Sequence, residues 1–534
     1  MERDEQEGRP SIFERPVSRL TALGLGAGAV FSLPAARVAY AASVATKSAS
    51  AAQTTLVTRG GSMPIARPPA SPAESLDPAT SLAAYEYLGA LYNRLVRQGS
   101  NGAVQPDLAL SWEPSSGATQ WTFHLRRGVT FHDGSPFTSR DVAYTLAHIL
   151  DPKVGSPQGG VLAPFVTASR IRTPDPHTVV VPLNSPNAEF PSLLMNYNCY
   201  IIPHGSAATI GKTGIGTGPF KLKSFRPAAT GVVEANPDYY EGRPHLDSIT
   251  FIAISDVQAR VNALLAGQVN LIAQTNLDFA TAKVIQANPS TTIAPVKNAL
   301  WYTMPMLATK APFTDVRVRQ AFKAAYDPHT LLQLTLQGYG TAAYNNPVPP
   351  TDPDWLPVRQ GQDVEKAKAL LKAAGYPSGL TIPLYTSSYD ANLTPLALAY
   401  KNAVAAAGIN VDVRQAPADS YYTKVWIVQP FCVSYWYTGR PIDQLLNEIF
   451  RGGSSYNESL WNNTSFTHLL DAARRQLDGA KRKQLYQEAQ RILVQQCGDM
   501  VPLFADRLTG ISRKVLNYHE HGFEFDYKNL ALAT

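Results

Sequence analysis

Apolar residues recur at helical spacing in several stretches of the chain, and most of these stretches end at a residue typical of a helix terminus. Between Val257 and Leu265 the apolar residues fall at positions i, i+4, i+7 and i+8, and Gly267 follows them. This pattern predicts an amphipathic helix that ends before the glycine. By the same reasoning we expect further helices over residues 82–97, 138–150, 363–374 and 395–407, and around 485–493.

Strands are predicted where short apolar runs alternate with polar residues or stand between turn residues. Residues 121–125 (WTFHL) alternate in this way, and 269–273 is a short apolar run after a predicted helix. Two further strands, 380–385 and 409–414, flank the helix expected over 395–407, which predicts a parallel βαβ unit. The chain is therefore expected to fold as a mixed α/β protein.

The amino terminus has the features of an export signal. Residues 20–33 (LTALGLGAGAVFSL) are uncharged and mostly apolar, and 39–41 (AYA) has the small-x-small pattern that signal peptidase accepts. This run of about 14 residues is shorter than the roughly 20 that a membrane-spanning helix needs. We therefore predict a signal peptide over 1–41, cleaved near Ala41, a tether over 42–53, and a periplasmic mature protein. A buried first helix is the alternative, and the choice between Sec and Tat export stays open.

The composition is that of a large globular protein. The chain has 534 residues, of which 45% are hydrophobic and 16% charged, and at about 150 residues per domain this length predicts several domains. Lys and Arg exceed Asp and Glu by 47 to 41 without a long basic run, so nucleic acid is not an expected partner. The three cysteines, Cys199, Cys432 and Cys497, are too few for a disulfide scaffold. Cys432 and Cys497 either pair with each other or remain buried thiols.

Motifs of catalysis are weak in this sequence. Residues 206–213 (SAATIGKT) end like a phosphate-binding loop but lack its leading glycine and a preceding strand. His519, Glu520 and His521 are spaced less well for a metal than H-E-x-x-H, and a polar surface turn is the simpler interpretation. A Gly-x-Ser-x-Gly nucleophile elbow is missing from the sequence. We therefore expect neither an enzyme nor a metal or other cofactor.

One long segment carries a family resemblance. Residues 121–150, WTFHLRRGVTFHDGSPFTSRDVAYTLAHIL, closely resemble the signature region of extracytoplasmic solute-binding proteins of ABC importers, of the peptide/nickel/oligopeptide type known as family 5. Further stretches agree with the family in order: 216–222 (GTGPFKL), 236–240 (NPDYY), 266–272 (AGQVNLI), 312–326 (PFTDVRVRQAFKAAY), 367–376 and 502–505. The resemblance covers nearly all of residues 54–534.

The resemblance implies an α/β, bilobal periplasmic-binding-protein fold with an additional lobe, the large cluster C form of type II. It places 54–95, 200–298 and 489–534 in lobe I, 96–199 in the additional lobe and 299–488 in lobe II. It also implies the function: a monomer captures a small-molecule or peptide ligand by hinge closure and delivers it to a permease and ATPase complex in the inner membrane.

The resemblance further singles out residues 435–441 (YWYTGRP). Peptide-binding relatives carry a Gly-Trp-x-x-Asp-Tyr pattern in which Asp pairs with the ligand's α-ammonium; here Trp436 is retained but Gly439 stands at the Asp position. Arg440 beside it could offer a bidentate fork to a carboxylate or phosphate, as in an opine or a sugar phosphate, or be a surface arginine before a proline. Asp443 could neutralise Arg440 or replace the missing acid, so peptides also remain possible ligands.

Aromatic residues complete the expected site. Tyr435, Trp436 and Tyr437 cannot all face one way in a strand, so we expect Trp436 in the cleft with one tyrosine packed behind it. The family layout adds Tyr302, after a hinge crossing, and Gly61, in the opening loop 59–63 of lobe I, as ligand contacts. Either of these could instead serve core or hinge packing.

Overall fold

The computed structural model describes residues 59–68, 74–81, 84–273, 275, 277–521 and 524–533. The signal peptide predicted over 1–41 and the tether over 42–53 lie outside them.

One large mixed sheet organises the described residues. Its nine strands run in the order β16-β12-β17-β11-β1-β10-β9-β8, with β13 beside β17. Strand β1 is parallel to both β10 and β11, and the other pairs are antiparallel. The strands are β1 (Ser62–Arg67), β8 (Phe220–Ser224), β9 (Gly231–Ala235), β10 (Ser248–Ala253), β11 (Leu271–Ile272), β12 (Thr291–Pro305), β13 (Gly340–Ala342), β16 (Ser434–Tyr437) and β17 (Asp499–Ser512).

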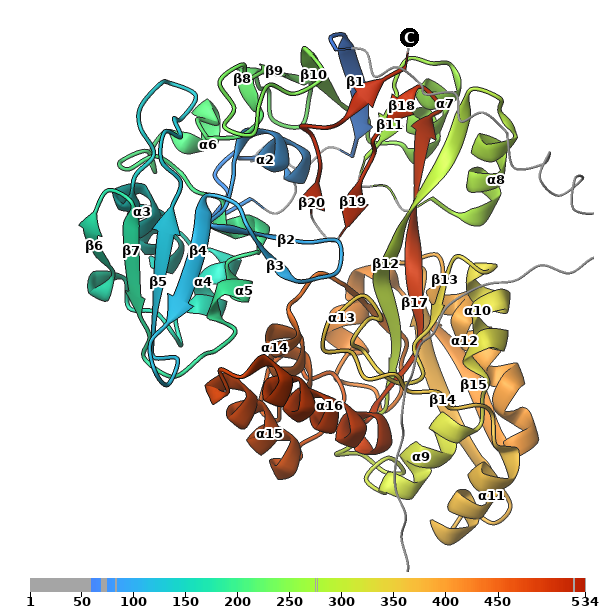
Figure 1. Ribbon diagram of the computed structural model, residues 1–534. Helices are drawn as coiled ribbons and strands as arrows, with labels where there is room; N and C mark the ends of the chain where they lie inside the picture. Colours follow the sequence, from blue (N-terminus) through green and yellow to red (C-terminus); the bar gives the residue numbers. More distant parts are fainter. Residues whose placement is uncertain are drawn as a thin grey trace, which may run out of the picture. The chain divides into compact units, whose positions relative to one another are not determined.

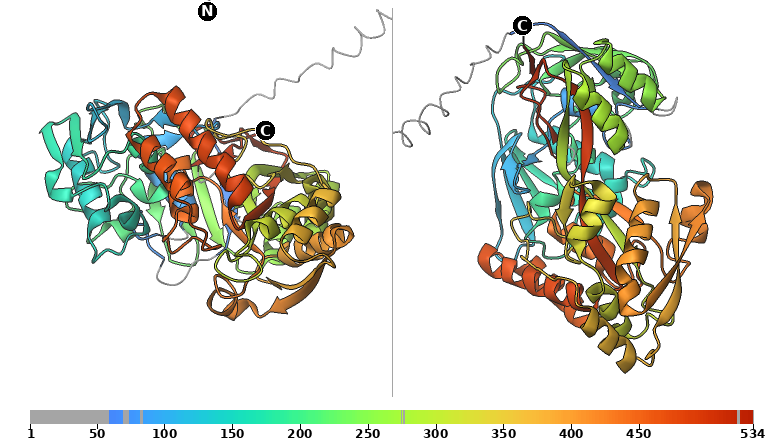
Figure 2. Two further views of the ribbon diagram at one scale, coloured as in Figure 1. Left: turned by 90° about the horizontal axis from the view of Figure 1, so that it is seen from below. Right: turned by 90° about the vertical axis from the view of Figure 1, so that its right-hand side faces the viewer.

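Strands β12 and β17 are the longest of this sheet and run side by side (Figures 1 and 2). Their two ends contribute to different hydrophobic cores: Ile293 packs with helices α7 (Val257–Leu265) and α8 (Phe279–Ala287), whereas Met304 packs with α9 (Val316–Ala324) and α12 (Leu393–Val404). The register shifts between Val296 and Leu300. Such a bulge bends a strand locally, so the pair changes direction between the two cores.

Residues 109–195 contribute most of a separate core, covered by a sheet of their own. This four-stranded sheet has the order β4-β5-β7-β6, and β5 alternates between half-buried and buried side chains because one face packs on the core. Its strands are β4 (Ala109–Pro114), β5 (Gln120–Leu125), β6 (Arg172–Asp175) and β7 (Thr178–Pro182), and its helices are α3 (Ser139–Leu150), α4 (Pro157–Leu162) and α5 (Phe190–Leu193).

A parallel βαβ unit follows further along the chain. Strands β14 (Leu380–Ser387) and β15 (Ile409–Ala416) pair in parallel, and α12 connects them. This confirms the unit predicted from the apolar pattern. Helices α10 (Pro328–Leu336) and α11 (Val364–Ala373) belong to the same part of the molecule, where both contribute buried leucines to one core.

The remaining elements are short, apart from two helices that precede β17. They are α2 (Tyr85–Leu91), β2 (Val96–Gln98), β3 (Val104–Pro106), α6 (Ile210–Thr213), α13 (Tyr421–Lys424), α14 (Ile442–Leu445), a π-helical turn (Leu446–Phe450), α15 (Thr464–Arg475), α16 (Gly479–Gln496), β18 (Val515–Leu516), β19 (Glu520–His521), β20 (Glu524–Phe525) and β21 (Ala531–Leu532), with 3₁₀ turns at 168–170, 197–199, 405–407 and 418–420.

Most predicted helices are confirmed, and one is wrong in extent. The α3 helix begins with a capping box between Thr138 and Asp141. The helix predicted over 82–97, however, is only α2, followed by an extended segment and β2. The carbonyl of Leu91 accepts a hydrogen bond from Gly218 N at 2.9 Å, and a Cβ on Gly218 would lie 2.4 Å from the Leu91 carbonyl carbon. A distant glycine loop therefore packs against the end of α2, where the helical spacing predicted continuation.

All three cysteines are free and buried. The disulfide between Cys432 and Cys497 that the sequence left open is therefore absent from the structure, and both thiols pack in hydrophobic clusters. Burial raises the pKa of both thiols. Both therefore stay protonated, and the thiol of Cys497 donates to Asp499 Oδ2 at 3.3 Å.

Candidate functional site

The candidate site is a cavity of about 800 Å³ between two parts of the chain. One side comes from α4, α5 and the residues after them, and the other from the segment that follows β16, together with α15. The residues that line the cavity include Tyr85, Arg94, Gly160, Phe165, Tyr197, Tyr437, Gly439, Arg440, Asp443, Gln444, Asn447, Glu448, Tyr456 and Arg474. Four of the eight predicted contacts, Tyr437, Gly439, Arg440 and Asp443, are among them.

Contacts with β12 position the segment that follows β16. Trp436 pairs with Trp301 across the two strands, and Thr438 donates from its hydroxyl to the carbonyl of Asn298 at 2.7 Å. Gly439 then adopts φ 102°, a conformation in which a side chain is strained. The glycine at the position of the family's aspartate therefore has a backbone reason: the turn that brings Arg440 to the cavity requires it.

Arg440 lies at the cavity with part of its guanidinium committed. Its Nε donates to Glu448 Oε2 at 3.2 Å and its Nη1 to the carbonyl of Tyr437 at 3.1 Å. The guanidinium carbon stands 5.4 Å from the centre of the Trp436 ring, within the range of a cation–π contact. The side chain remains 27% exposed. These contacts hold the guanidinium in one orientation at the cavity wall.

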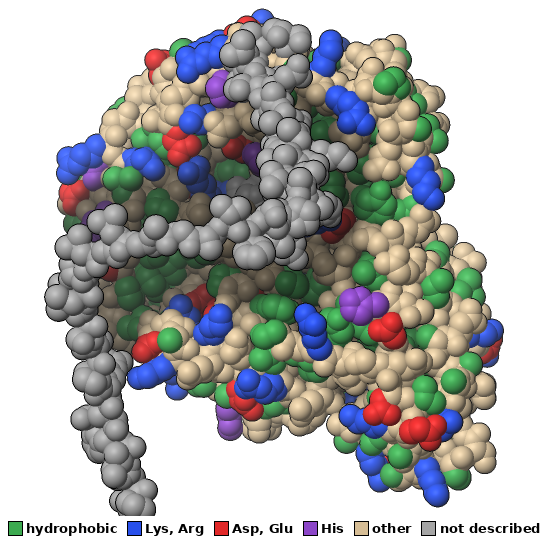
Figure 3. All heavy atoms as spheres, turned by 45° about the vertical axis from the view of Figure 1, so that its right-hand side comes forward, with side chains coloured by type: hydrophobic (Ala, Val, Ile, Leu, Met, Phe, Trp, Pro, Cys, Tyr) green, Lys and Arg blue, Asp and Glu red, His purple; other side chains and the backbone are tan. Residues whose placement is uncertain are grey.

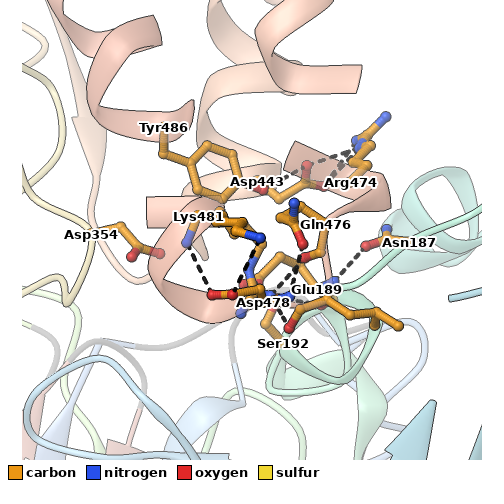
Figure 4. A network of polar contacts seen from close by, with 12 residues as sticks. Asn187, Glu189, Ser192, Asp354, Asp443, Arg474, Gln476, Asp478, Lys481 and Tyr486 are labelled. Atoms are coloured by element: carbon orange, nitrogen blue, oxygen red, sulfur yellow. Dashed lines mark hydrogen bonds and ion pairs between the residues drawn. The ribbon is translucent and has the colours of Figure 1, made fainter. Parts of the chain in front are cut away.

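Asp443 is fully buried and engaged by a second arginine (Figure 4). Arg474 donates to both carboxylate oxygens, from Nε at 2.8 and 3.1 Å and from Nη2 at 2.9 Å, and Tyr486 donates to the same carboxylate at 3.3 Å. Burial lowers the pKa of Arg474, but the charge of Asp443, the hydrogen bonds to it and smaller effects of Tyr486 and Asp471 together raise the pKa above its ordinary value. Asp443 therefore neutralises Arg474, a partner that neither sequence alternative included, and does not pair with Arg440.

The aromatic residues of β16 face different neighbours. Trp436 stacks on Trp301 with 6.2 Å between ring centres, and its Nε1 donates to Glu458 at 3.0 Å. Tyr435 packs edge-on against Tyr302. Tyr437 lines the cavity and is 48% exposed. Trp436 thus supports Arg440 from outside the cavity lining, and Tyr437 is the ring of this strand that reaches the cavity.

A buried carboxyl anchors this aromatic cluster. Glu458 accepts hydrogen bonds from the indole nitrogens of Trp426, at 2.7 Å, and Trp436. Burial raises the pKa of Glu458 to about 8, and the nearby carboxylate of Asp499 adds to the effect. A protonated Glu458 keeps the indoles in place without placing a net charge in the core.

The remaining predicted contacts lie away from this lining. Tyr302 is fully buried and donates to Asp390 at 2.9 Å, while its hydroxyl accepts from Asn392. It therefore packs in the core, the alternative that the sequence left open. Gly61 precedes β1, where its N–H donates to Asp247 at 2.9 Å.

Sequence reasoning missed the opposite wall of the cavity. Arg94 and Phe165 lie on it with Tyr85 and Tyr197, whose rings meet edge-on 4.8 Å apart. The guanidinium of Arg474 stands 5.0 Å from the Phe165 ring centre, which links the two walls. These residues come from segments that are distant in sequence and carry no shared motif.

Polar contacts join the two walls beside the cavity (Figure 4). The N–H of Ala188 donates to the carbonyl of Arg474 at 2.7 Å, and Glu189 forms an ion pair with Arg482 in the first turn of α16. Burial raises the pKa of Glu189 to about 7, although the charge of Arg482 opposes the shift. The segment 187–192 is thereby fastened to helices α15 and α16.

Among the described residues, no cluster of three His, Cys, Asp or Glu side chains is arranged to hold a metal ion. Glu520 of the predicted polar turn forms an ion pair with Arg507. None of the helices that the structure describes combines the length and apolar character needed to cross a membrane.

Figure 3 shows a hollowed face in which hydrophobic side chains gather, with charged side chains on the surface around it.

Known proteins resemble this chain over most of its length. Heme-binding protein A of Haemophilus influenzae is 27% identical over 474 residues, which cover 82% of this chain and 85% of that protein. Di/tripeptide-binding protein 2 of Pseudomonas aeruginosa is 27% identical over 465 residues, 79% of this chain and 86% of that protein. These relatives are binding proteins, named for what they bind.

Solved structures show the same fold. HbpA2 from Haemophilus parasuis superposes with a TM-score of 0.78 at 23% identity, covering 89% of this chain and 100% of that chain. The PBP AgaA from A. tumefaciens R10, in complex with agropinic acid, gives 0.69 at 26% identity, covering 89% and 99%. The predicted fold class, the α/β periplasmic-binding-protein fold of type II in its cluster C form, is confirmed.

The family model described as bacterial extracellular solute-binding proteins, family 5 Middle, matches residues 103–457, more than half of the chain. The chain therefore belongs to the family 5 extracellular solute-binding proteins, the substrate-binding components of ABC importers.

Proposed function

We propose that this chain captures its solute in the 800 Å³ cavity and presents it to the permease and ATPase of an importer. The observation that carries the proposal is that the two walls of the cavity come from different hydrophobic cores, one built mainly from residues 79–201 and one from 301–504. A ligand that contacts both walls stabilises the arrangement in which they face each other.

The proposal keeps the lobe boundaries that the family resemblance implies. Residues 54–95, 200–298 and 489–534 form lobe I, 96–199 the additional lobe and 299–488 lobe II. The bulge in β12 near Asn298, where the residue has φ 49°, is the place where the chain bends between lobes I and II. The protein acts as a monomer, is exported with cleavage near Ala41, and binds its solute without chemical change.

A blocked cavity tests this function. Gly160 lines the cavity, and a Cβ added to it meets open space, so Gly160→Trp places an indole in the solute's volume. Gly361 is exposed outside the cavity lining and has similar free space, so Gly361→Trp is the matched control.

The measurement is a thermal-shift screen of the mature protein, freed of bound ligand by unfolding and refolding, against di- and tripeptides, opines, sugars and sugar phosphates. A ligand at 100 times its Kd adds about 2.7 kcal/mol of stability. We expect the wild type and Gly361→Trp to respond and Gly160→Trp to lose the response. A response that survives in Gly160→Trp, or no response to any compound, would contradict capture in this cavity.

A further inference from the structure

The charges around the cavity favour a negative ligand group. Among the described residues, five charged side chains line the cavity: Arg94, Arg440, Arg474, Asp443 and Glu448. Positive groups therefore exceed negative groups in the lining by one. A partly enclosed cavity strengthens the interaction of these charges with a ligand.

The buried carboxylate of Asp443 is already occupied. Asp443 is held bidentately by Arg474 and accepts from Tyr486. A ligand ammonium would have to compete with Arg474 for it, and leaving that arginine unpaired is unfavourable. Glu448 accepts from Arg440 and, at 2.9 Å, from the amide of Gln444, and both of these bonds end on its Oε2.

Arg440, by contrast, keeps donors for a ligand. A guanidinium has five N–H donors, and Arg440 uses one at Nε and one at Nη1. Within the described residues its Nη2 makes no hydrogen bond, so Arg440 keeps both N–H groups of Nη2 and the second N–H of Nη1 for a ligand. Trp436 below and Glu448 beside it fix the plane of the fork, which lowers the entropic cost of bidentate binding.

Half-exposed rings lie next to this fork. Tyr437 supplies the carbonyl that Nη1 contacts, and Tyr437 and Tyr456 are each 48% exposed while lining the cavity. Such rings bind the flat or apolar body of a ligand.

We infer that the solute carries a carboxylate or phosphate group that Arg440 binds, and that it needs no free ammonium group. This rests on the proposed function, capture in the same cavity, and names the substrate class. Arg440 is then the specificity-determining residue, and the Asp443–Arg474 pair removes the acid that would otherwise favour an amino-terminal ammonium.

A set of capped ligands tests the assignment by isothermal titration calorimetry on ligand-stripped protein. The dipeptide Ala-Phe is compared with N-acetyl-Ala-Phe, with Ala-Phe amide and with N-acetyl-Ala-Phe amide, so that the ammonium and the carboxylate are removed separately. The opine N-(1-carboxyethyl)phenylalanine provides a second carboxylate, and glucose 6-phosphate with glucose as its neutral match distinguishes phosphate from carboxylate.

We expect an anionic compound of the set to bind, and the matching compound without the anionic group to bind more weakly. Removing the ammonium group should not change this order. Arg440→Gln should weaken the anion by roughly 10- to 100-fold, the range for a hydrogen bond to a charged group, and Arg440→Lys should lie between. The control is Arg414→Gln. Like Arg440, Arg414 pairs with a carboxylate, that of Asp412, and lies over an aromatic ring, that of Tyr385, but it stands away from the cavity lining.

Two results overturn the inference while leaving solute capture standing: Ala-Phe amide or another compound without an anionic group binds best, or Arg440→Gln leaves anion binding unchanged. If no compound binds, neutral, cationic or anionic, the proposed function fails together with the inference. Melting temperatures of the variants, measured in parallel, separate a lost contact from a lost fold.

Discussion

Two arginines at the cavity each face a carboxylate, and their surroundings make them different. Arg474 on α15 is 19% exposed and its partner Asp443 is fully buried, with both carboxylate oxygens engaged. Arg440, in the turn after β16, is 27% exposed and its partner Glu448 20% exposed, with a single nitrogen of Arg440 donating to the carboxylate.

The difference teaches that pairing alone does not decide whether a charge serves structure or binding. A bidentate pair with one fully buried partner stabilises the fold, because removing either partner leaves the other charge buried without a counter-charge. A partly exposed pair held by one contact is weak, so its arginine can hold a ligand as well. The predictions below test this contrast between the Asp443–Arg474 pair and the Arg440–Glu448 pair.

The largest effect is expected for Asp443→Ala, which leaves Arg474 partly buried without its partner. We expect the free energy of unfolding, measured by urea denaturation, to fall by about 3–5 kcal/mol. Asp412→Ala is the control, since Asp412 and Arg414 are both about half exposed and such a pair contributes under about 1 kcal/mol. Equal losses in the two variants would remove the distinction between the pairs.

Glu458 holds Trp436, the ring under Arg440, and its contribution to the free energy of unfolding is expected to depend on pH. Its pKa of about 8 in the folded protein exceeds the ordinary value, so the folded state holds the proton more tightly than the unfolded chain. The stabilising contribution is complete below the ordinary pKa and is lost as the pH rises through about 8, with a slope of up to about 1.4 kcal/mol per pH unit.

Unfolding measured between pH 5 and 9 checks this prediction. Glu458→Gln should flatten the decline, and Glu448→Gln should leave it unchanged. A decline that is the same in all three proteins would assign it to other groups, such as the neighbouring Asp499.

A smaller effect is expected for Tyr486→Phe, which removes one hydrogen bond to Asp443. Loss of a single buried hydrogen bond costs about 1 kcal/mol, and the three bonds from Arg474 should remain. Tyr456→Phe, at a half-exposed ring, should change stability much less. A loss at Tyr486 comparable to that of Asp443→Ala would show that the tyrosine, and not the arginine, holds the buried carboxylate.

The smallest effect on stability is expected for Glu448→Gln. The pair with Arg440 is partly exposed, so its loss should cost about 0.2–1 kcal/mol, and less at high salt. Because Glu448 helps to fix the plane of the Arg440 guanidinium, the variant should bind N-acetyl-Ala-Phe several-fold more weakly in calorimetry. Tighter binding of that ligand would instead mean that the charge of Glu448 opposes the anion more than the carboxylate positions the guanidinium.

Part of the fold and part of the site were predictable from sequence. The helix over 138–150 and the βαβ unit around 395–407 were correct because local spacing and caps determine them. The helix over 82–97 was too long, since a loop that is 127 residues away from Leu91 packs against the end of α2 at Gly218. The segment 437–443 was found through a family motif, whereas Tyr302 proved to be a buried core ring.

The sequence by itself determined the α/β class, the family and the segment that carries Arg440, because these depend on local periodicity and on motifs that stay intact along the chain. Only the tertiary structure decided which charges are available to a ligand. Asp443 and Arg474 are 31 residues apart, and Arg440 and Glu448 are eight. Their roles follow from burial and from partners brought together by folding, and neither property is written in the identity of a single residue.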